Sequence, residues 1–475
     1  MTNYIVDSTG AGDFATLTAA AKAAQPGDVF NVKAGTYRER LDANVAQVTW
    51  QAEPGVIIDG GWRGGMAGTG WTPVLSVTAP GCTVSGFDVR NSFGRGILIQ
   101  ASDTTLAGCR TNNTFQGALQ VGDGTGAAIS NVSVRDCVFT KMSQSWVTEK
   151  RPQNVNGCVN IHNAVDSLFE GNVVSDGWGE GINIGRNSTR VIVRGNTVHS
   201  CNHVLIYFNR AQDCIIENNI AYHIPDPLYG GKKGDSYSAG IIVGDERGAR
   251  LDRFAFSRGN VIRGNLVVNT GKLFQVRNNA IDDGYDTVLE DTVIENNTFV
   301  AGPVTTTGIE ILGNRRGRSN SNSVFRNNAV VFDDAAAGAD IGTFNSTGVT
   351  FSRNGWTSPP PQTMRDAADV WGDAMLDNPS AVIKRVDGVV TDFDRNNYRP
   401  LPGSPLVDAP VIGAMEPETE PEPEPEPKPE PEWDWILAEM EDQRAQLATI
   451  SLAVEDAQEI NRIVTGYINA LRKEL

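Results

Sequence analysis

A short motif recurs through the middle of this 475-residue chain: an aliphatic or aromatic residue, any residue, Gly or Asn, and then Asn. The closing asparagines are Asn172, Asn196, Asn219, Asn265, Asn297 and Asn328, spaced 24, 23, 46, 32 and 31 residues apart. A period near 23 residues is too short for a two-helix repeat, and the intervening segments are strand-like, so an all-β solenoid is expected. We expect the asparagines to stack at a bend, because Asn tolerates a left-handed backbone and its amide can bond the Asn one coil above.

A second strand-like segment repeats in phase with this motif, as in Gly181-Ile182-Asn183-Ile184. Side chains alternate between the two faces of a strand, so one set lies inside the solenoid and the other outside. The outward row in this register is predicted to be Asn160, Asn183, Ile206, Ile242, Gln275 and Glu310. Weaker copies extend upstream to Val84, and together they predict about ten to twelve coils of a parallel β-helix.

The net charge of −17 is concentrated near the C-terminus. Residues 416–432 contribute −7 and residues 433–475 contribute −4, which leaves −6 for residues 1–415. No basic stripe favours nucleic acid as a partner, and no apolar run of about 18 residues predicts membrane insertion. The six cysteines lack zinc spacing, and Cys109 and Cys137, in the ladder slot of successive coils, are expected to stack as small buried hydrophobes.

Both ends of the repeat region carry further signals. Residues 18–25, rich in Ala and stopped by Pro26-Gly27, predict a helix that caps the open end of the solenoid. The segments that follow are Gly27-Asp28-Val29-Phe30-Asn31-Val32 and Ala34-Gly35-Thr36-Tyr37, and the distal segment is Tyr398–Asp408. Together with the asparagine repeat, these residues resemble the pectate-lyase-like superfamily of right-handed parallel β-helices over about residues 3–415.

The resemblance implies a fold more than an activity. The superfamily includes lyases, hydrolases, epimerases, esterases and non-catalytic phage proteins of the tail-fibre and tailspike kind. Its Gly-His-Gly, Arg-x-Lys and Arg-x-Pro-x-x-Arg signatures do not occur in this sequence, which disfavours those enzyme subclasses. The sequence also enters its first strand-like segment directly after Met1, with no basic and apolar leader, as expected of a virion protein released by lysis that acts outside the cell.

The C-terminal part differs in composition from the repeat region. Residues 416–432 alternate Glu and Pro, which predicts a stiff, extended linker between a β-helix at 1–415 and a helix at 433–475. Eleven of thirteen a and d positions in that helix are apolar, which predicts a coiled coil and a homo-oligomer. The predicted oligomerisation residues are Leu447, Ile450, Val454, Asn461, Val464 and Ile468. A trimer is expected from phage β-helix fibres, although Asn461 at an a position favours a dimer, and packing of the helix on its own solenoid is the alternative.

The 46-residue step between Asn219 and Asn265 inserts extra chain on both sides of residues 239–243, in loops 224–238 and 244–258. Solenoids carry function on such insertions, although charge-rich loops are also ordinary solvated surface. Paired carboxylates can supply acid and base for glycoside cleavage, and the catalytic candidates are Asp245, Glu246 and Glu180. Aromatic and cationic groups suit sugar binding, and the candidates are Trp146, His162, Trp178, Arg186, Tyr229, Lys232, Lys233 and Arg247. Trp178 could instead fill the end of its own loop.

The first functional hypothesis is a phage structural protein that presents a β-helix to host-surface polysaccharide and contacts other virion proteins. The second is a polysaccharide lyase or glycoside hydrolase, and the third is a purely structural spacer. No cofactor or metal is expected, except Ca²⁺ if the protein is a lyase, for which the sequence shows no motif.

Overall fold

The chain folds into a parallel β-helix in the computed structural model. The structure describes residues 1–63, 72–123, 126–144, 157–224, 239–247, 254–277, 287–313, 318–332, 336, 339–344, 346–379, 385–386, 389–390, 393–407 and 413–414. All of them belong to one compact unit, Met1–Glu418. The linker at 416–432 and the coiled coil at 433–475, with all six of its proposed oligomerisation residues, lie outside the described residues and stay predictions.

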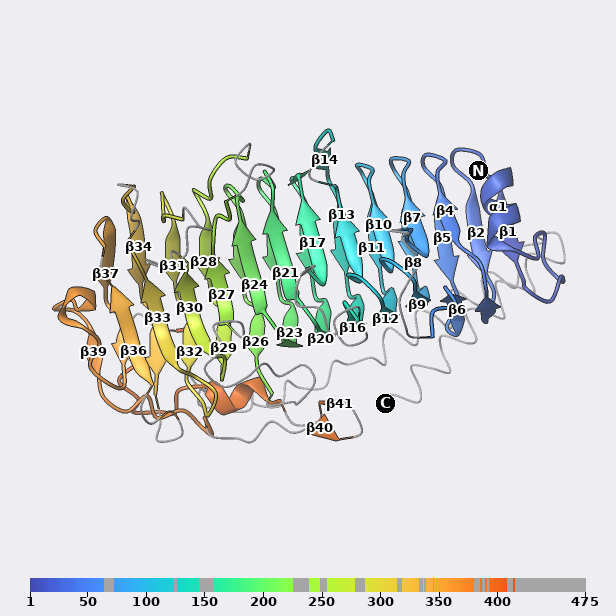
Figure 1. Ribbon diagram of the computed structural model, residues 1–475. Helices are drawn as coiled ribbons and strands as arrows, with labels where there is room; N and C mark the ends of the chain where they lie inside the picture. Colours follow the sequence, from blue (N-terminus) through green and yellow to red (C-terminus); the bar gives the residue numbers. More distant parts are fainter. Residues whose placement is uncertain are drawn as a thin grey trace, which may run out of the picture. The chain divides into compact units, whose positions relative to one another are not determined.

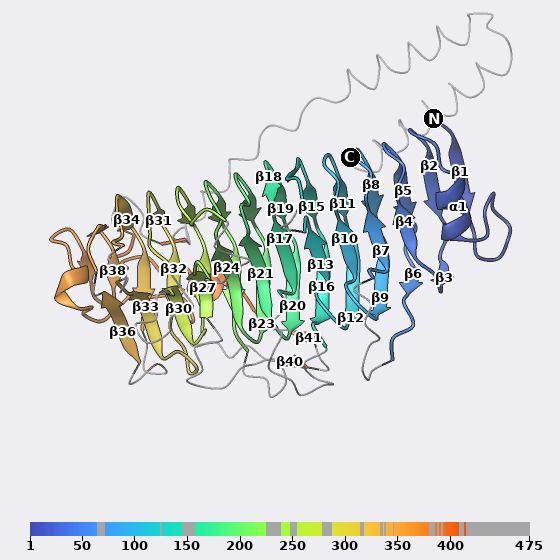
Figure 2. The same cartoon turned by 45° about the horizontal axis from the view of Figure 1, so that its top comes forward.

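Three long parallel sheets, here called A, B and C, form the walls of the solenoid (Figures 1 and 2). Each coil runs from sheet A through sheet B to sheet C, and each strand pairs with the equivalent strand of the next coil. Sheet C has 11 strands, within the predicted ten to twelve coils, and sheets A and B have 13 each, because the terminal coils add strands to these two sheets only.

The strands of the three sheets have the following bounds. Sheet A consists of β1 (Asn3–Val6), β2 (Val29–Val32), β5 (Thr49–Ala52), β8 (Thr83–Ser85), β11 (Thr105–Ala107), β15 (Ser133–Arg135), β19 (Leu168–Glu170), β22 (Ile192–Arg194), β25 (Ile215–Glu217), β28 (Val261–Arg263), β31 (Val293–Glu295), β34 (Ser323–Arg326) and β37 (Val349–Ser352). Sheet B consists of β3 (Gly35–Tyr37), β6 (Val56–Asp59), β9 (Asp88–Ser92), β12 (Arg110–Thr114), β16 (Val138–Met142), β20 (Val173–Gly177), β23 (Thr197–Cys201), β26 (Ile220–Tyr222), β29 (Leu266–Val268), β32 (Thr298–Val300), β35 (Ala329–Val331), β38 (Gly355–Trp356) and β39 (Val370–Trp371). Sheet C consists of β4 (Leu41–Ala43), β7 (Leu75–Val77), β10 (Ile97–Ile99), β13 (Leu119–Val121), β17 (Val159–His162), β21 (Glu180–Gly185), β24 (Val204–Asn209), β27 (Ala239–Val243), β30 (Lys272–Val276), β33 (Thr307–Ile311) and β36 (Asp340–Phe344).

Apolar side chains from all three sheets stack in rows inside the solenoid. One row on sheet A is made of buried residues in register on successive coils: Val134, Phe169, Val193, Ile216, Ile262, Ile294 and Phe325. Burying one such side chain contributes about 1.5–3 kcal/mol, so the repeated row is a main source of stability.

The predicted asparagine ladder is present. Every ladder member from Asn172 to Asn328 donates a hydrogen bond from its side-chain Nδ2 to the Oδ1 of the next ladder asparagine, over 2.9–3.3 Å, and Asn354 ends the series. The same Oδ1 also accepts the backbone N–H of the preceding member, as Asn219 does for Asn196. Because each position needs a side chain that both donates and accepts, Asn is required throughout the row.

The left-handed residue of each bend is the one before the ladder asparagine. Gly171, Gly195, Asn218, Gly264, Asn296 and Asn327 have φ values between 53° and 66°. Only Gly, Asn and Asp adopt this region readily, which explains the Gly or Asn at the third motif position. The ladder asparagines therefore provide the hydrogen bonds, and their neighbours provide the turn.

The predicted outward row on sheet C is wrong at one position. Asn183 of β21 pairs with Tyr207 of β24, and Tyr207 pairs with Ile242, whereas Ile206 pairs with the inward residue Ile182. A one-residue shift in strand register moves every side chain to the other face. The outward row is thus Gln120, Asn160, Asn183, Tyr207, Ile242, Gln275 and Glu310.

Both ends of the solenoid are covered. The expected N-terminal helix is α1 (Leu17–Ala23), capped by Thr16, and its Leu17 and Ala20 are buried in the core. Near the other end, Ala374, Leu376, Phe393, Leu406 and Tyr398 of the 3-10 helix η3 (Arg395–Tyr398) pack on the outer face of sheet B. There Tyr222 stacks on Phe393 with ring centroids 4.1 Å apart. The other 3-10 helix, η2 (Gln362–Met364), and the short strands β14 (Ile129–Ser130), β18 (Ala164–Val165), β40 (Arg385–Val386) and β41 (Val389–Val390) complete the described elements.

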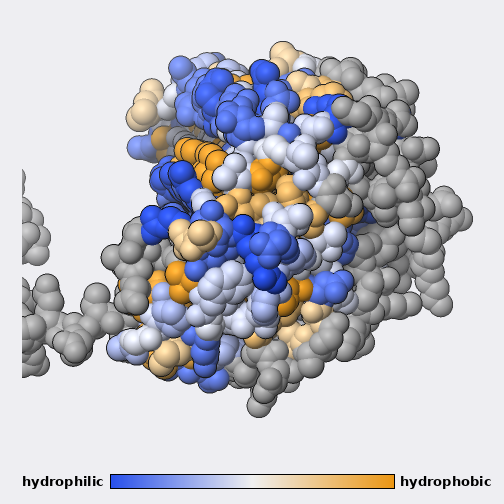
Figure 3. Space-filling model, turned by 90° about the vertical axis from the view of Figure 1, so that its left-hand side faces the viewer, coloured by the Kyte–Doolittle hydropathy of each residue, from blue (hydrophilic) through white to orange (hydrophobic). Residues whose placement is uncertain are grey.

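Seen from its C-terminal coils, the solenoid surface shows hydrophobic and hydrophilic residues in alternating rows (Figure 3). One hydrophilic row lies on sheet A, where acidic and basic side chains alternate from coil to coil: Arg135, Glu170, Arg194, Glu217, Arg263, Glu295 and Arg326. Cys109 and Cys137 are free and buried, as are the other four cysteines. No helix within the described part of the chain has the length and apolar character to span a membrane.

Candidate active site

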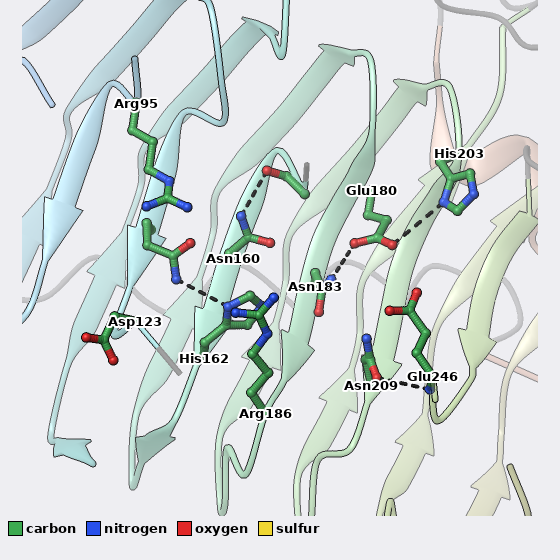
Figure 4. Close-up of a pocket in the computed structure, with 12 residues that line it drawn as sticks. Arg95, Asp123, Asn160, His162, Glu180, Asn183, Arg186, His203, Asn209 and Glu246 are labelled. Atoms are coloured by element: carbon green, nitrogen blue, oxygen red, sulfur yellow. Dashed lines mark hydrogen bonds and ion pairs between the residues drawn. The ribbon is translucent and has the colours of Figure 1, made fainter. Parts of the chain in front are cut away.

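A polar pocket of about 330 Å³ lies on the outer face of sheet C (Figure 4). Its floor is formed by Gln120, Asn160 and Asn183, which occupy one outward row on β13, β17 and β21. The inward neighbours of these residues fill the core, so alternation along each strand points the amides into the pocket. The remaining lining residues come from these strands and from the turns around them: Arg95, Asp123, Gly157, His162, Glu180, Arg186, His203, Asn209 and Glu246.

One end of the pocket is cationic. Arg95 and Arg186 lie on either side of His162 (Figure 4). Burial and the neighbouring charge of Arg186 lower the pKa of Arg95 to about 10. Burial, together with the charges of Arg186 and Arg95, holds the pKa of His162 well below its usual value. His162 is therefore neutral at physiological pH. Asp123 also lines this end and partly offsets the two guanidinium groups, which leaves one net positive charge to attract an anionic group.

The other end is acidic and is formed by Glu180, His203 and Glu246 (Figure 4). Glu180 is the first residue of β21 and is buried, with its Oε1 3.7 Å from His203 Nδ1. Glu246 follows β27, so the two carboxyl groups are brought together by strands that are separated by about 60 residues of sequence.

The two glutamates influence each other electrostatically. Burial raises the pKa of Glu246, and the negative charge of Glu180 raises it further. A carboxyl group with a raised pKa beside a second carboxyl group is the arrangement that supplies a general acid at neutral pH. The pair can therefore perform acid–base chemistry on a bound glycosidic bond.

Asn183 connects the two ends of the pocket. Its Nδ2 donates a hydrogen bond to Glu180 Oε2, and a hydrogen bond with His162 opposes the lowering of the pKa of that imidazole. The same amide therefore contacts both the acidic end and the end that carries the arginines.

Asp245, the neighbour of Glu246, does not line the pocket. It is completely buried, and its carboxylate accepts hydrogen bonds from the backbone N–H of Arg210 (3.0 Å) and the hydroxyl of Ser257 (2.6 Å). Arg210 in turn donates from Nε to the carbonyl of Glu246 and from Nη1 to the carbonyl of Phe254. These contacts tie residues 245–246 to 254–257, so Asp245 acts as a structural anchor beneath Glu246.

Four predicted site residues therefore meet in the pocket: Glu180, Glu246, His162 and Arg186. Trp178 and Arg247 are partly exposed and do not line it, although each lies close in sequence to a residue that does. Trp146, Tyr229, Lys232 and Lys233 lie outside the described residues and stay predictions.

Sequence reasoning did not assign Arg95, Gln120, Asp123, His203 or Asn209 to a site. The corrected outward row of sheet C leads to Gln120, since it continues from Asn160 by one coil. Arg95 and His203 lie in turns next to sheet C strands and Asn209 is the last residue of β24, and no repeat pattern marks these positions. Among the described residues no three His, Cys, Asp or Glu side chains gather in a way that would hold a metal ion, and the conditional Ca²⁺ site stays a prediction.

Comparison with known proteins agrees with the fold. A family model for the right-handed β-helix region matches residues 74–256. Pectate lyase Pel9A aligns with a TM-score of 0.55 at 14% identity, covering 88% of this chain and 96% of that chain. A mannuronic-acid-specific family 6 polysaccharide lyase from the human gut microbiota aligns with a TM-score of 0.51 at 14% identity, covering 78% of this chain and 91% of that chain. The Dettilon tailspike protein aligns with a TM-score of 0.48 at 14% identity, covering 73% and 62% of the two chains.

A comparison with curated proteins finds no match. At 14% identity the two lyases share a fold with this chain, and their activities are not carried over. The protein thus has the right-handed parallel β-helix fold of pectate-lyase-like proteins, as the resemblance implied.

Proposed function

We propose that this β-helix binds an anionic polysaccharide in the sheet C pocket and hydrolyses one of its glycosidic bonds. The observation that carries the proposal is the pair of carboxyl groups of buried Glu180 and partly buried Glu246, at one end of a polar pocket whose other end carries two arginines. Hydroxyl-rich sugars match the amide floor, and a sugar carboxylate or sulfate matches the two arginines.

In this mechanism Glu246 is the general acid. It transfers its proton to the glycosidic oxygen as the bond from that oxygen to the anomeric carbon breaks, and the leaving sugar departs as a neutral alcohol. In one course Glu180 attacks the anomeric carbon and forms a glycosyl ester, which a water molecule then hydrolyses after giving its proton to ionised Glu246; in the other course Glu180 removes a proton from the water molecule that attacks the anomeric carbon directly. Retention of anomeric configuration indicates the first course, and inversion indicates the second.

The proposal is tested by incubating the full chain and a Glu246→Gln variant with a panel of acidic bacterial-surface and uronic-acid polysaccharides. Glutamine keeps the shape of the side chain but cannot release a proton, so we expect reducing ends to form at least about 100-fold more slowly while the polysaccharide is still retained. The matched control is Glu310→Gln, which changes a part-buried glutamate on the same sheet that does not line the pocket.

Hydrolytic activity in Glu246→Gln equal to that of the wild type would remove Glu246 from the mechanism. Retention of polysaccharide without any release of reducing ends by the wild type would instead favour a purely binding role. A structural spacer would show neither retention nor release.

A second candidate reaction, β-elimination from a uronate, is supported by His162. A neutral imidazole between two guanidinium groups can accept the proton next to a carboxylate that those cations neutralise. Lyase action produces unsaturated sugars that absorb ultraviolet light, whereas hydrolysis produces reducing ends alone. His162→Gln should abolish the ultraviolet signal if elimination is the reaction.

We further propose that the protein works outside the cell as part of a phage virion, as a tail fibre, tailspike or minor tail component. The support is the predicted Glu/Pro linker and the predicted coiled coil, which suit a virion protein that presents a β-helix at a distance. Antibodies against the β-helix should label purified phage particles. Absence of the protein from particles that contain all other tail proteins would contradict this setting.

A further inference from the structure

The hydroxyl group of Tyr207 lies between two oxygen atoms beneath the pocket. It is 2.6 Å from the backbone carbonyl oxygen of Gly244 and 3.2 Å from Oε1 of Glu246. Tyr207 belongs to the outward row of sheet C and is almost fully buried, with 2% of its surface exposed. The close approach depends on glycine, because a Cβ atom at residue 244 would lie 2.9–3.0 Å from the tyrosine ring and hydroxyl.

One hydroxyl group has one proton to donate, and here it faces two acceptors. The Gly244 carbonyl can only accept, and it is the nearer of the two. If Tyr207 donates to Gly244, its own oxygen remains as an acceptor towards Glu246. The contact with Glu246 is then a hydrogen bond only when Glu246 carries the proton and donates it.

The backbone holds this arrangement in place. The N–H of Gly244 donates to the carbonyl of Phe208 over 2.9 Å, and the anchor formed by Asp245, Arg210 and Ser257 fixes the next residues. The N–H of Asp245, which shares a peptide with the Gly244 carbonyl, donates to the Thr287 hydroxyl over 2.7 Å and so restricts rotation of that carbonyl away from Tyr207. Among the described residues, Glu246 faces Glu180 of β21, His203 just before β24, and Tyr207 itself. As a donor to ionised Glu246, Tyr207 would lower the pKa of that carboxyl group, whereas as an acceptor from the protonated acid it would raise it. The shorter 2.6 Å hydrogen bond to the Gly244 carbonyl favours the acceptor role.

We propose that Tyr207 is a positioning residue that keeps the catalytic proton on Glu246 by accepting a hydrogen bond from the protonated carboxyl group. The catalytic role of Tyr207 rests on the proposed function, but the protonation of Glu246 can be measured without any substrate. This hydrogen bond would favour the protonated form of Glu246, in addition to burial and the charge of Glu180.

The sign of the effect of Tyr207→Phe distinguishes the two hydrogen-bond directions. If Tyr207 accepts from protonated Glu246, the variant removes support for the protonated form, and the titration of Glu246 moves to lower pH by about 0.5–1 unit. If Tyr207 instead donates to ionised Glu246, the titration moves to higher pH. The readout is carbon NMR of protein labelled at the glutamate carboxyl groups, with the Glu246 signal assigned by its loss in Glu246→Gln.

The matched control is Tyr37→Phe, which removes another buried tyrosine hydroxyl bonded to backbone carbonyls, those of Val6 and Lys33, near the N-terminus. The Glu246 titration should not change in this control. A shift to higher pH in Tyr207→Phe, or no shift, would overturn the proposal.

A second measurement does not depend on changing Tyr207. The raised pKa of Glu246 means that the folded state binds this proton more tightly than the unfolded state, so stability is lost as pH rises above the unfolded value of about 4.5. Glutamine resembles the protonated acid, so Glu246→Gln should melt at a higher temperature than the wild type at pH 8 and at a similar temperature at pH 4. Equal melting temperatures at both pH values would contradict a proton held on Glu246.

The cleavage assay separates failure of this inference from failure of the proposed function. If Tyr207 acts as proposed, the alkaline limb of the kcat/KM profile also moves to lower pH in Tyr207→Phe. If the Glu246 titration is unchanged in Tyr207→Phe while Glu246→Gln is inactive, the hydrolase proposal is supported and the role of Tyr207 is not. If the titration shifts but the protein cleaves no polysaccharide, the hydrogen bond from Glu246 to Tyr207 is supported and the hydrolase proposal is not.

Discussion

Asp245 and Glu246 are adjacent acids with opposite surroundings. The carboxylate of Asp245 points inward to Ser257 and the backbone of Arg210, whereas the carboxyl group of Glu246 points into the pocket. Burial raises the pKa of Asp245, while the hydrogen bonds from Ser257 and Arg210 oppose that rise. The sequence position alone made both residues equal candidates for catalysis, and the direction of each side chain separates them.

We expect Asp245→Ala to destabilise the fold by about 2–4 kcal/mol, because it leaves the hydroxyl and the backbone N–H of Ser257 without an acceptor and removes one of the two acceptors of the Arg210 N–H. Asp245→Asn should cost less, since its side-chain oxygen still accepts hydrogen bonds. Urea unfolding of each variant measures the loss, with the exposed Asp377→Ala as the control. An Asp245→Ala variant as stable as the wild type would show that the anchor contributes little.

The asparagine ladder is the feature that most directly joins one coil to the next. Asn219 has a buried side chain that donates to Asn265 and accepts from Asn196. Asn219→Leu should therefore cost about 1–3 kcal/mol, because both neighbouring amides lose a partner in the interior. Chemical denaturation measures this loss, and the exposed Asn44→Leu should leave the unfolding midpoint nearly unchanged. The same midpoint for both variants would contradict a stabilising role for the ladder.

The described β-helix forms a complete core of its own, with α1 at one end and Ala374, Leu376, Phe393, Tyr398 and Leu406 on sheet B. The predicted coiled coil at 433–475 should therefore control assembly without being needed for folding. Deletion of 433–475 should leave a folded solenoid that has lost its oligomeric state, as measured by light scattering and circular dichroism. An unchanged mass after the deletion would show that the β-helices associate by themselves.

The sequence by itself determined the fold, because the information in a solenoid is local and repeated. Each Gly/Asn-Asn pair specifies one bend, and each alternating segment specifies one wall, so the coils could be counted without knowing any long-range contact. The same pattern placed Asn160 and Asn183 on the outer face. It failed at Ile206, because the segment Val204–Phe208 is apolar throughout, so nothing local shows which of two adjacent residues faces outward or reveals a one-residue slip.

Only the tertiary structure decided the site. Glu180 and Glu246 come from different coils, and what brings their carboxyl groups together is the stacking of β21, β24 and β27, which no local pattern encodes. Arg95 and His203 reach the same pocket from turns whose residues are free to vary without disturbing the repeat. Burial and neighbouring charge, which depend on these packed coils, then make Glu246 a proton donor and Asp245 an anchor.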